Sequence, residues 1–174
     1  MRYKDVAIIG MSMRFAGVDN KEEFRNLLLN KKTGFGKPSQ KRLEQMGCDP
    51  DSEYLKCGYL DDISGFDYGY FKINKKEAEL MAPEQRICLE MAAETILDAG
   101  YSLESVRGSN CAVLVCGSDM EYADYIKRNT STSIMGSMRC MQSGKIGFYF
   151  DLQGENMTFD SGCSSALAAV HYGC

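Results

Sequence analysis

The segment from Phe159 to His171 places a cysteine at a position that favours a reactive thiolate. Residues 157–159 predict a short strand, Gly162 among small serines permits a sharp turn, and Ala166–Val170 predict a helix of small apolar residues. This order sets the Cys163 sulfur at the first turn of the helix, as in a nucleophile elbow. Free N–H groups and the positive helix end favour a thiolate there by roughly 0.3 to 2 kcal/mol. Such a thiolate can attack a thioester.

Spacing alone leaves two interpretations of Cys163 open. It is either an activated nucleophile or a structural cysteine at a helix start. The single histidine, His171, follows eight residues later on the same predicted helix, about 12 Å away at roughly 1.5 Å per residue. That separation excludes it as the base for Cys163, because a base must lie within hydrogen-bond reach. We interpret His171 as a residue that packs against or caps something.

Composition indicates a globular protein. The chain has 174 residues, 44% of them hydrophobic and 25% charged, so it can bury a core and is not disordered. Its longest apolar runs fall far short of the roughly 20 residues that span a bilayer. Its start has no signal-peptide pattern, so we expect no membrane association and a cytoplasmic location. The net charge of −4, with basic residues interleaved among acidic ones, argues against a nucleic-acid partner.

The eight cysteines are the unusual feature of the composition. None forms a CxxC pair, and one histidine provides no metal-ligand spacing, so we expect no bound metal. Four of the cysteines lie in apolar periodic segments, where free thiols behave as small core residues. We favour reduced cytosolic thiols over four disulfides. No nucleotide cofactor is expected, because GxGxxG spacing is absent and Ser143–Ile146 lacks the P-loop pattern.

The first part of the chain predicts one strand, one helix and one irregular stretch. Val6–Ile9 is a β-branched run closed by glycine, which predicts a buried strand. Asn20, with Glu23 three residues later, predicts the start of a helix that ends near Lys31. Residues 35–71 are rich in turn residues and lack sustained periodicity, so we expect a long packed surface excursion.

A second series of elements leads to Cys163. Asn74 predicts the start of a short helix, and Pro83 predicts the first turn of a longer one. Cys111–Cys116 is apolar throughout, as in a strand covered by helices on both faces, and residues 118–129 indicate another helical segment. This alternation is typical of an α/β layered domain. The predicted apolar stripe of the longer helix consists of Ile87, Met91, Ala92, Ile96 and Leu97.

Four motifs at compatible spacing resemble the β-ketoacyl synthases, which are the condensing domains of polyketide and fatty acid synthases. The resemblance runs from about Asp5 to the end of the chain and is closer to modular polyketide synthases than to free-standing enzymes. The motifs are AIIGMSMRFAG (Ala7–Gly17), the helical stretch Phe66–Gly100, CAVLVCG (Cys111–Gly117) and FDSGCSSALAAVH (Phe159–His171), which is similar to the active-site signature. Met13, Ala16, Ala82 and Gly162 depart from the usual Cys, Pro, Asp and Ala.

The resemblance implies a fold and an activity. The fold is α/β and thiolase-like, with α-β-α-β-α layers. Residues 1–174 would form the N-terminal portion of a single ketosynthase domain, with one mixed sheet and the buried helix that follows the nucleophile. Cys163 would accept an acyl group from an acyl carrier protein for decarboxylative Claisen condensation with a malonyl extender. The substrate would arrive on the carrier's phosphopantetheine arm, with no cofactor bound. Family dimers pair through the strand near residues 157–159, so a homodimer is implied.

The resemblance also implies that part of the domain lies outside this chain. The family's two histidines and a lysine near them belong to the C-terminal portion. Independently, Ala166–Val170 are apolar around the whole helix, which predicts burial on all sides that half a domain cannot provide. We therefore expect the isolated chain to be inactive in condensation unless another chain supplies the remainder. The alternative is a truncated, non-condensing half that acts as a docking or dimerisation module.

Overall fold

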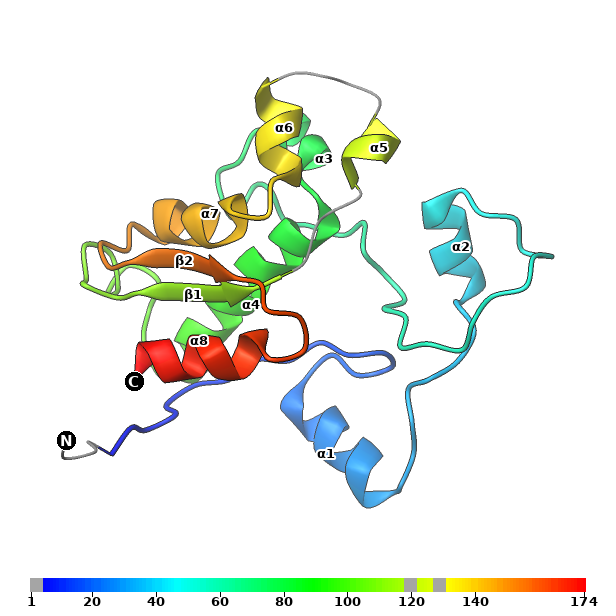
Figure 1. Ribbon diagram of the computed structural model, residues 1–174, viewed down its shortest axis with the longest axis horizontal. Helices are drawn as coiled ribbons and strands as arrows, with labels where there is room; N and C mark the ends of the chain where they lie inside the picture. The colour runs from blue at the N-terminus through cyan, green and yellow to red at the C-terminus, as the bar shows by residue number, and fades with distance from the viewer. Residues whose placement is uncertain (1–4, 118–121, 127–130) are drawn as a thin grey trace. The chain divides into compact units, whose positions relative to one another are not determined.

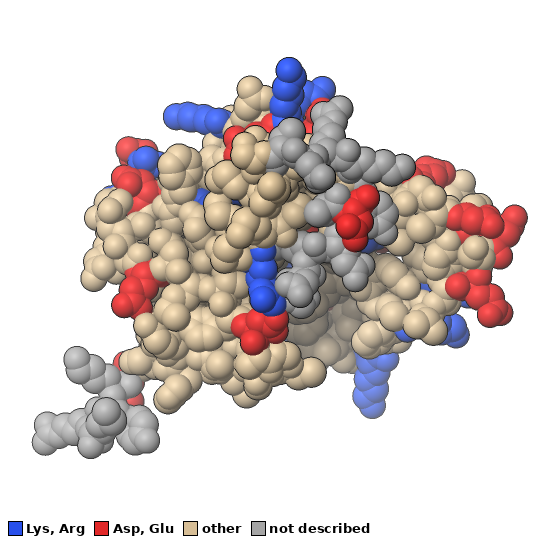
Figure 2. Space-filling view, turned by 45° about the horizontal axis from the view of Figure 1, so that its top comes forward, with Lys and Arg blue, Asp and Glu red and all other residues tan. Residues whose placement is uncertain are grey.

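The computed structural model describes residues 5–117, 122–126 and 131–174, which form two compact units (Figure 1). The smaller unit consists of residues 12–65, and the larger consists of residues 66–174 together with the segment up to Met11. No helix within the described ranges is long and apolar enough to cross a membrane. Basic and acidic side chains are interspersed over the face shown in Figure 2, as their interleaving in the sequence suggests.

The first helix of the smaller unit, α1 (Lys21–Leu29), begins where the sequence predicts. The Asn20 side chain accepts a hydrogen bond from the Glu23 N–H at 2.9 Å. The Glu23 carboxylate in turn accepts from the Asp19 N–H at 2.9 Å. The first bond satisfies an N–H group that the helix itself leaves without a partner, and the second fixes the backbone just before the cap. The prediction of a helix start at Asn20 is confirmed.

The second helix, α2 (Gln40–Met46), lies inside the stretch expected to be irregular. That expectation is wrong for these residues. The Ser39 hydroxyl caps the helix at its start, and Gly47 ends it in the left-handed conformation at φ +62°. Leu43 is the one buried residue of α2. A seven-residue helix with one buried position carries no apolar periodicity, so only its two cap residues could have indicated it.

Asp62 holds the end of the smaller unit onto α2. Its carboxylate lies 2.7 Å from the Lys41 ammonium and accepts from the backbone N–H groups of Ser64 and Gly65 at 2.8 and 3.1 Å. The Gln45 amide donates to the same carboxylate at 2.9 Å. Lys41 first, and then the two backbone N–H groups, hold the pKa of Asp62 well below its ordinary value of 3.8. The ionised carboxylate therefore stabilises this unit.

We expect Asp62→Asn to lower the free energy of unfolding by about 1 kcal/mol at pH 7, because Asp62 and its partners are partly exposed and screened by water. The stabilisation exists above the ordinary pKa of the carboxyl and is lost as pH falls below about 4 towards the lowered native pKa. Urea unfolding from about pH 7 to pH 3 should therefore show a flatter acid limb in the variant. Asp61→Asn is the matched control, and equal acid limbs for Asp62→Asn and the parent would contradict this assignment.

Six helices build the part of the larger unit that the structure describes. α3 begins after Asn74, whose side chain accepts from the Lys76 N–H at 2.9 Å. α4 begins with Pro83 in its first turn. Both starts confirm the sequence predictions. Of the helical stretch predicted at residues 118–129, α5 is described and the remainder lies outside the described residues. The helices are α3 (Lys75–Leu80), α4 (Pro83–Asp98), α5 (Tyr122–Ile126), α6 (Ser131–Ser137), α7 (Met141–Phe150) and α8 (Ser165–Gly173).

Among the described residues, two strands lie between the helices of the larger unit, and they form a parallel sheet rather than the mixed sheet that the resemblance implied. β1 (Val113–Cys116) pairs with β2 (Asn156–Phe159) in a register that sets Val113 opposite Asn156. α7 packs on one side of this sheet and α8 on the other (Figure 1). The predicted strands at residues 111–116 and 157–159 are confirmed. Because the strands are parallel, their carboxyl ends, and hence Gly117 and Asp160, lie at the same edge of the sheet.

The core of the larger unit lies between α4, α7 and β1. The buried face of α4 overlaps only partly with the predicted stripe, because Ala92 and Ile96 pack against the core while residues outside the stripe take the fully buried positions. Its buried residues are Gln85, Arg86, Leu89 and Ala93, whereas Leu97 is 52% exposed. Gln85 takes a core position because its amide donates to the carbonyl groups of Met135 and Met138 at 3.1 and 3.2 Å. The buried cluster consists of Phe71, Ile73, Ala78, Met81, Leu89, Ala93, Val113, Ile146, Phe150 and Leu152.

The strand predicted at Val6–Ile9 is absent from the described residues. Val6 is 61% exposed and Ile8 is 83% exposed. The segment is instead attached through its end, where the Met11 N–H donates to Asp98 at 3.0 Å and Gly10 lies against the backbone of α4. The prediction of a buried strand is therefore wrong here. A β-branched run becomes a strand only when another strand pairs with its backbone groups.

Candidate active site

Cys163 lies on an exposed turn between β2 and α8. β2 ends at Phe159, Gly162 adopts the left-handed conformation at φ +62°, and α8 begins at Ser165. The predicted strand, tight turn and helix are thus all present. The cysteine stands just before the helix rather than within its first turn, because the left-handed glycine extends the turn to Ser164. Its side chain is exposed rather than packed into the core.

Serine side chains hold the backbone of this turn. The Ser165 hydroxyl accepts from the Ser161 N–H at 2.9 Å and donates to the Gly162 carbonyl at 2.7 Å. The Ser164 hydroxyl donates to the Ser161 carbonyl at 2.9 Å. Ser165 is 7% exposed, so its two hydrogen bonds are largely shielded from water. The small serines therefore do more than permit a sharp bend, since they fix the backbone groups that precede Cys163.

A charged pair lies next to the same turn and was not anticipated from the sequence. Asp160 directly follows β2, and its carboxylate forms an ion pair with the guanidinium of Arg139. The other carboxylate oxygen accepts from the Gly162 N–H at 3.3 Å. Arg139 comes from the segment between α6 and α7, more than twenty residues away in sequence. Sequence patterns do not indicate a contact between two residues so far apart in the chain.

Behind the turn, the carboxyl edge of the sheet is closely packed. The Gly117 N–H donates to the Phe159 carbonyl at 3.3 Å and continues the pairing beyond β1. Any side chain at Gly117 would collide with the amide of Gln142, which is 4% exposed. Ser143 and Thr158 join α7 to β2 through a 3.0 Å hydrogen bond between their hydroxyl groups. The turn therefore projects from a rigid support, which suits a residue that must be positioned for chemistry.

α8 presents one apolar face to the sheet and another to the surroundings. Ser165 and Ala169 are buried, whereas Leu167 is 77% exposed and Val170 is 63% exposed. Burial on all sides, predicted from the sequence, is therefore not achieved by the described residues. His171 lies exposed in the last turn of the same helix, two turns beyond Cys163. The described part of the chain holds no group of three or more His, Cys, Asp or Glu side chains that could bind a metal.

A buried lysine on α7 belongs to a second cluster of titratable side chains, which the sequence did not indicate. The Lys145 side chain is 8% exposed, and its ammonium lies 3.9 Å from the Glu77 carboxylate. The Tyr149 hydroxyl donates to that carboxylate at 3.0 Å. Burial lowers the pKa of Lys145 and raises the pKa of Tyr149. These three side chains connect α3 to α7, and we assign them to stability.

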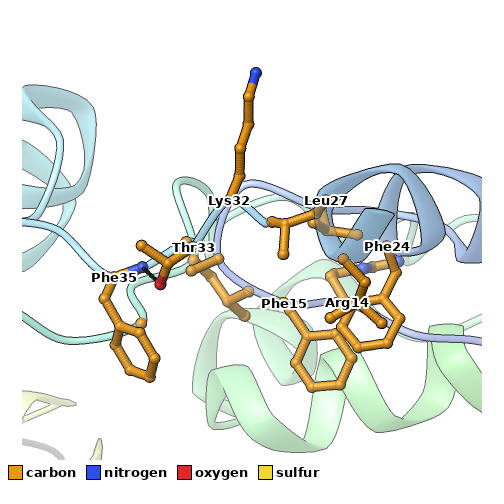
Figure 3. A pocket seen from close by; sticks show the side chains of 13 residues that line it. Arg14, Phe15, Phe24, Leu27, Lys32, Thr33 and Phe35 are labelled. Carbon is orange, nitrogen blue, oxygen red and sulfur yellow. Dashed lines mark hydrogen bonds between the residues drawn. The ribbon is translucent and has the colours of Figure 1, made fainter. Parts of the chain in front are cut away.

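The smaller unit contains an open apolar cavity of about 620 Å³ (Figure 3). The rings of Phe15 and Phe24 lie side by side in it, with centroids 5.1 Å apart, and Leu27 also lines the cavity. The Lys32 side chain extends away from these apolar groups (Figure 3). The Thr33 hydroxyl accepts a hydrogen bond from the Phe35 N–H at 3.1 Å, and both residues line the cavity. None of the lining residues belongs to the Cys163 turn.

Comparison with known families identifies the class of protein to which this arrangement belongs, a strand, a turn with an exposed cysteine, and a helix. The family model for the N-terminal domain of β-ketoacyl synthases matches residues 3–174. The chain therefore belongs to the β-ketoacyl synthase family. The fold and the resemblance predicted from the four sequence motifs are both confirmed by this match and by the solved structures below.

Relatives of this chain include large polyketide synthases. Polyketide synthase PksM of Bacillus subtilis is 38% identical over 172 residues, which are 97% of this chain and 4% of that protein. Methylphloroacetophenone synthase of Cladonia uncialis is 32% identical over 97% of this chain and 7% of its own length. This chain thus corresponds to one small part of each of these large synthases.

Solved structures confirm the thiolase-like fold of the family's ketosynthase domains. The ketosynthase from module 6 of the bacillaene synthase of Bacillus subtilis superposes with a TM-score of 0.79 at 30% identity, over 96% of this chain and 28% of that one. An oxazolomycin ketosynthase domain of Streptomyces albus superposes with a TM-score of 0.77 at 24% identity, and supports the fold alone. The chain therefore corresponds to about three-tenths of each solved chain.

Proposed function

We propose that Cys163 is the acyl-accepting nucleophile of a ketosynthase that extends acyl chains in polyketide or fatty acid synthesis. The observation that supports this role is the exposed thiol on a braced turn between β2 and α8, inside a segment that belongs to the β-ketoacyl synthase family. The proposed partner is an acyl carrier protein, and the acyl group would arrive on its phosphopantetheine arm. No cofactor bound to this chain enters the proposal.

The proposed first step is thioester exchange. The Cys163 thiolate attacks the carbonyl carbon of the acyl thioester and forms a carbon–sulfur bond, and negative charge develops on the carbonyl oxygen. The Cys163 N–H is the donor we assign to that oxygen. Collapse of this intermediate breaks the bond to the carrier's sulfur, which leaves as a thiolate and takes up a proton. The acyl group then remains on Cys163 as a thioester.

The second proposed step needs groups beyond residues 1–174. In the family, two histidines bind a malonyl extender and promote its decarboxylation, and the carbanion attacks the acyl-cysteine. His171 does not fit this role, since it lies two turns along α8 from the cysteine. We propose that this chain requires the family's C-terminal portion, from its parent protein or another chain, and that the complete domain is a cytoplasmic homodimer.

The 174-residue chain can be tested for both steps with acyl and malonyl carrier proteins. We expect intact-mass measurement to show a single acyl adduct, which peptide mapping places on Cys163, and no β-keto product. The absence of an adduct, or an adduct spread over the other seven thiols, would contradict the proposed nucleophile. A β-keto product from this chain alone would contradict the proposed need for the C-terminal portion.

The second candidate function is a non-condensing docking or dimerisation module. The observation that favours it is the apolar face of α8, where Leu167 and Val170 are largely exposed. A cysteine-selective alkylation series separates the two functions. If Cys163 reacts no faster than the other exposed thiols, the module is the better account. If Cys163 reacts faster, the acyl-accepting role is supported.

A further inference from the structure

The carboxylate of Asp160 is bonded to two different parts of the larger unit. One oxygen accepts from the Gly162 N–H at 3.3 Å, directly before the proposed nucleophile. The other oxygen pairs with the guanidinium of Arg139, which precedes α7. Each of the two side chains is about one-third exposed, so neither is freely solvated. A single side chain thus connects the Cys163 turn to the segment that leads into α7, the helix on the other side of the sheet from α8.

The contact with the Gly162 N–H restrains the backbone directly before Cys163. Gly162 has φ +62°, a conformation that glycine adopts without steric cost but does not by itself prefer over others. Ser165 already binds the Gly162 carbonyl, and Ser164 already binds the Ser161 carbonyl. The Asp160 carboxylate restrains a further backbone group of the turn, the N–H of Gly162. Together these bonds restrict the torsions that decide where the next residue, Cys163, points.

The orientation of the Asp160 carboxylate itself requires a second contact. An exposed aspartate that accepts one 3.3 Å hydrogen bond can rotate away from it, because water competes for the same oxygen. The Arg139 guanidinium restrains the second oxygen and also balances the negative charge of Asp160, three residues before the thiol. Arginine suits this purpose because its planar donors remain charged and directional.

We propose that Asp160 and Arg139 are positioning residues, which hold the Cys163 turn in the geometry that accepts an acyl group. This inference rests on the proposed function of Cys163. Neither side chain is assigned contact with the acyl group or a place in proton transfer. The pair acts through the Gly162 backbone, and its loss should impair the attack on a large carrier-bound thioester more than the reaction of the thiol with a small reagent.

Four variants of the 174-residue chain test the pair. We expect Asp160→Ala to slow acyl loading of Cys163 about 10- to 100-fold, and Asp160→Asn and Arg139→Met to slow it about 3- to 10-fold. Arg139→Lys, which keeps the charge, should recover most of the loading rate lost in Arg139→Met. Alkylation of Cys163 by iodoacetamide should change less than about threefold in all four variants, a difference that a merely structural role would not produce.

The matched control is Arg107→Met. Arg107 also lies near an aspartate in the larger unit, 3.8 Å from Asp151, and the two side chains are 43% and 44% exposed. Its loss should leave loading within about twofold of the parent. Equal thermal unfolding midpoints of the Arg139 and Arg107 variants would show that any difference in loading is not a folding defect. Loading by Asp160→Ala within twofold of the parent would overturn the proposal.

A second measurement separates this proposal from the proposed function. The exchange rate of the Gly162 amide, followed by NMR, reports on the turn whether or not the chain accepts an acyl group. We expect severalfold faster exchange in Asp160→Ala and in Arg139→Met, with no change in Arg107→Met. If the parent chain does not load, the nucleophile assignment fails while amide exchange still decides whether the pair holds the turn. Unchanged Gly162 exchange in Asp160→Ala would overturn the positioning role.

Discussion

We expect Cys163→Ala to abolish acyl loading of the 174-residue chain, with a loss of at least about 100-fold measured by intact mass and peptide mapping. The reason is chemical, because alanine provides no atom that can form the new bond to the acyl carbon. The side chain is exposed, and no hydrogen bond of the turn depends on its sulfur within the described residues. We therefore expect folding to be unchanged.

Cys174→Ala is the matched control for this loss. Cys174 is also an exposed thiol, and it lies at the other end of α8. It should load at the parent's rate. If loading survives in Cys163→Ala and disappears in Cys174→Ala, the acylated residue is Cys174, and the proposed function is contradicted. Equal loading of both variants would point to non-specific acylation of surface thiols.

Leu89→Ala has the largest expected effect on stability, a loss of about 2 to 5 kcal/mol in the free energy of unfolding. Leu89 is completely buried on α4, within the cluster that joins α4, α7 and β1. Truncation removes its contacts with these neighbours and leaves a cavity that a close-packed core fills only in part. Urea unfolding followed by circular dichroism measures the change.

Leu97→Ala provides the comparison on the same helix. Leu97 is 52% exposed although the sequence pattern places it on the apolar stripe. Its truncation should cost less than about 1 kcal/mol, since much of the side chain is already in water. Equal losses for the two variants would contradict the placement of Leu89 in the core and of Leu97 at the exposed edge of α4.

Local signals in the sequence predict the elements that cap residues define. Asn20 and Asn74 each start a helix with a side-chain hydrogen bond, and Pro83 occupies a first turn where its missing N–H costs nothing. The turn at Gly162 was likewise predictable, because a positive φ and small neighbours leave a clear pattern. In these cases the residues that determine the structure are neighbours in the chain.

The parts that the sequence did not predict depend on distant residues. The side chain of Gln85 takes a buried position on α4, where carbonyl groups some fifty residues away accept its hydrogen bonds. Val6–Ile9 has the composition of a strand, but strand formation depends on a pairing partner that composition does not specify. The contact of Arg139 with Asp160 likewise arises only after two elements pack together. Periodicity reports hydrophobicity along one element and contains no information on such pairings.

The parallel pairing of β1 with β2 has a consequence for the order of folding. Val113 faces Asn156, so the sheet joins residues more than forty positions apart, with α7 and the helices before it in the intervening crossover. Closing so long a loop carries an entropy cost that local helix formation does not. During synthesis, α4 and β1 emerge from the ribosome well before their partner strand. The Cys163 turn directly follows β2, so its position depends on a pairing that must close this long crossover.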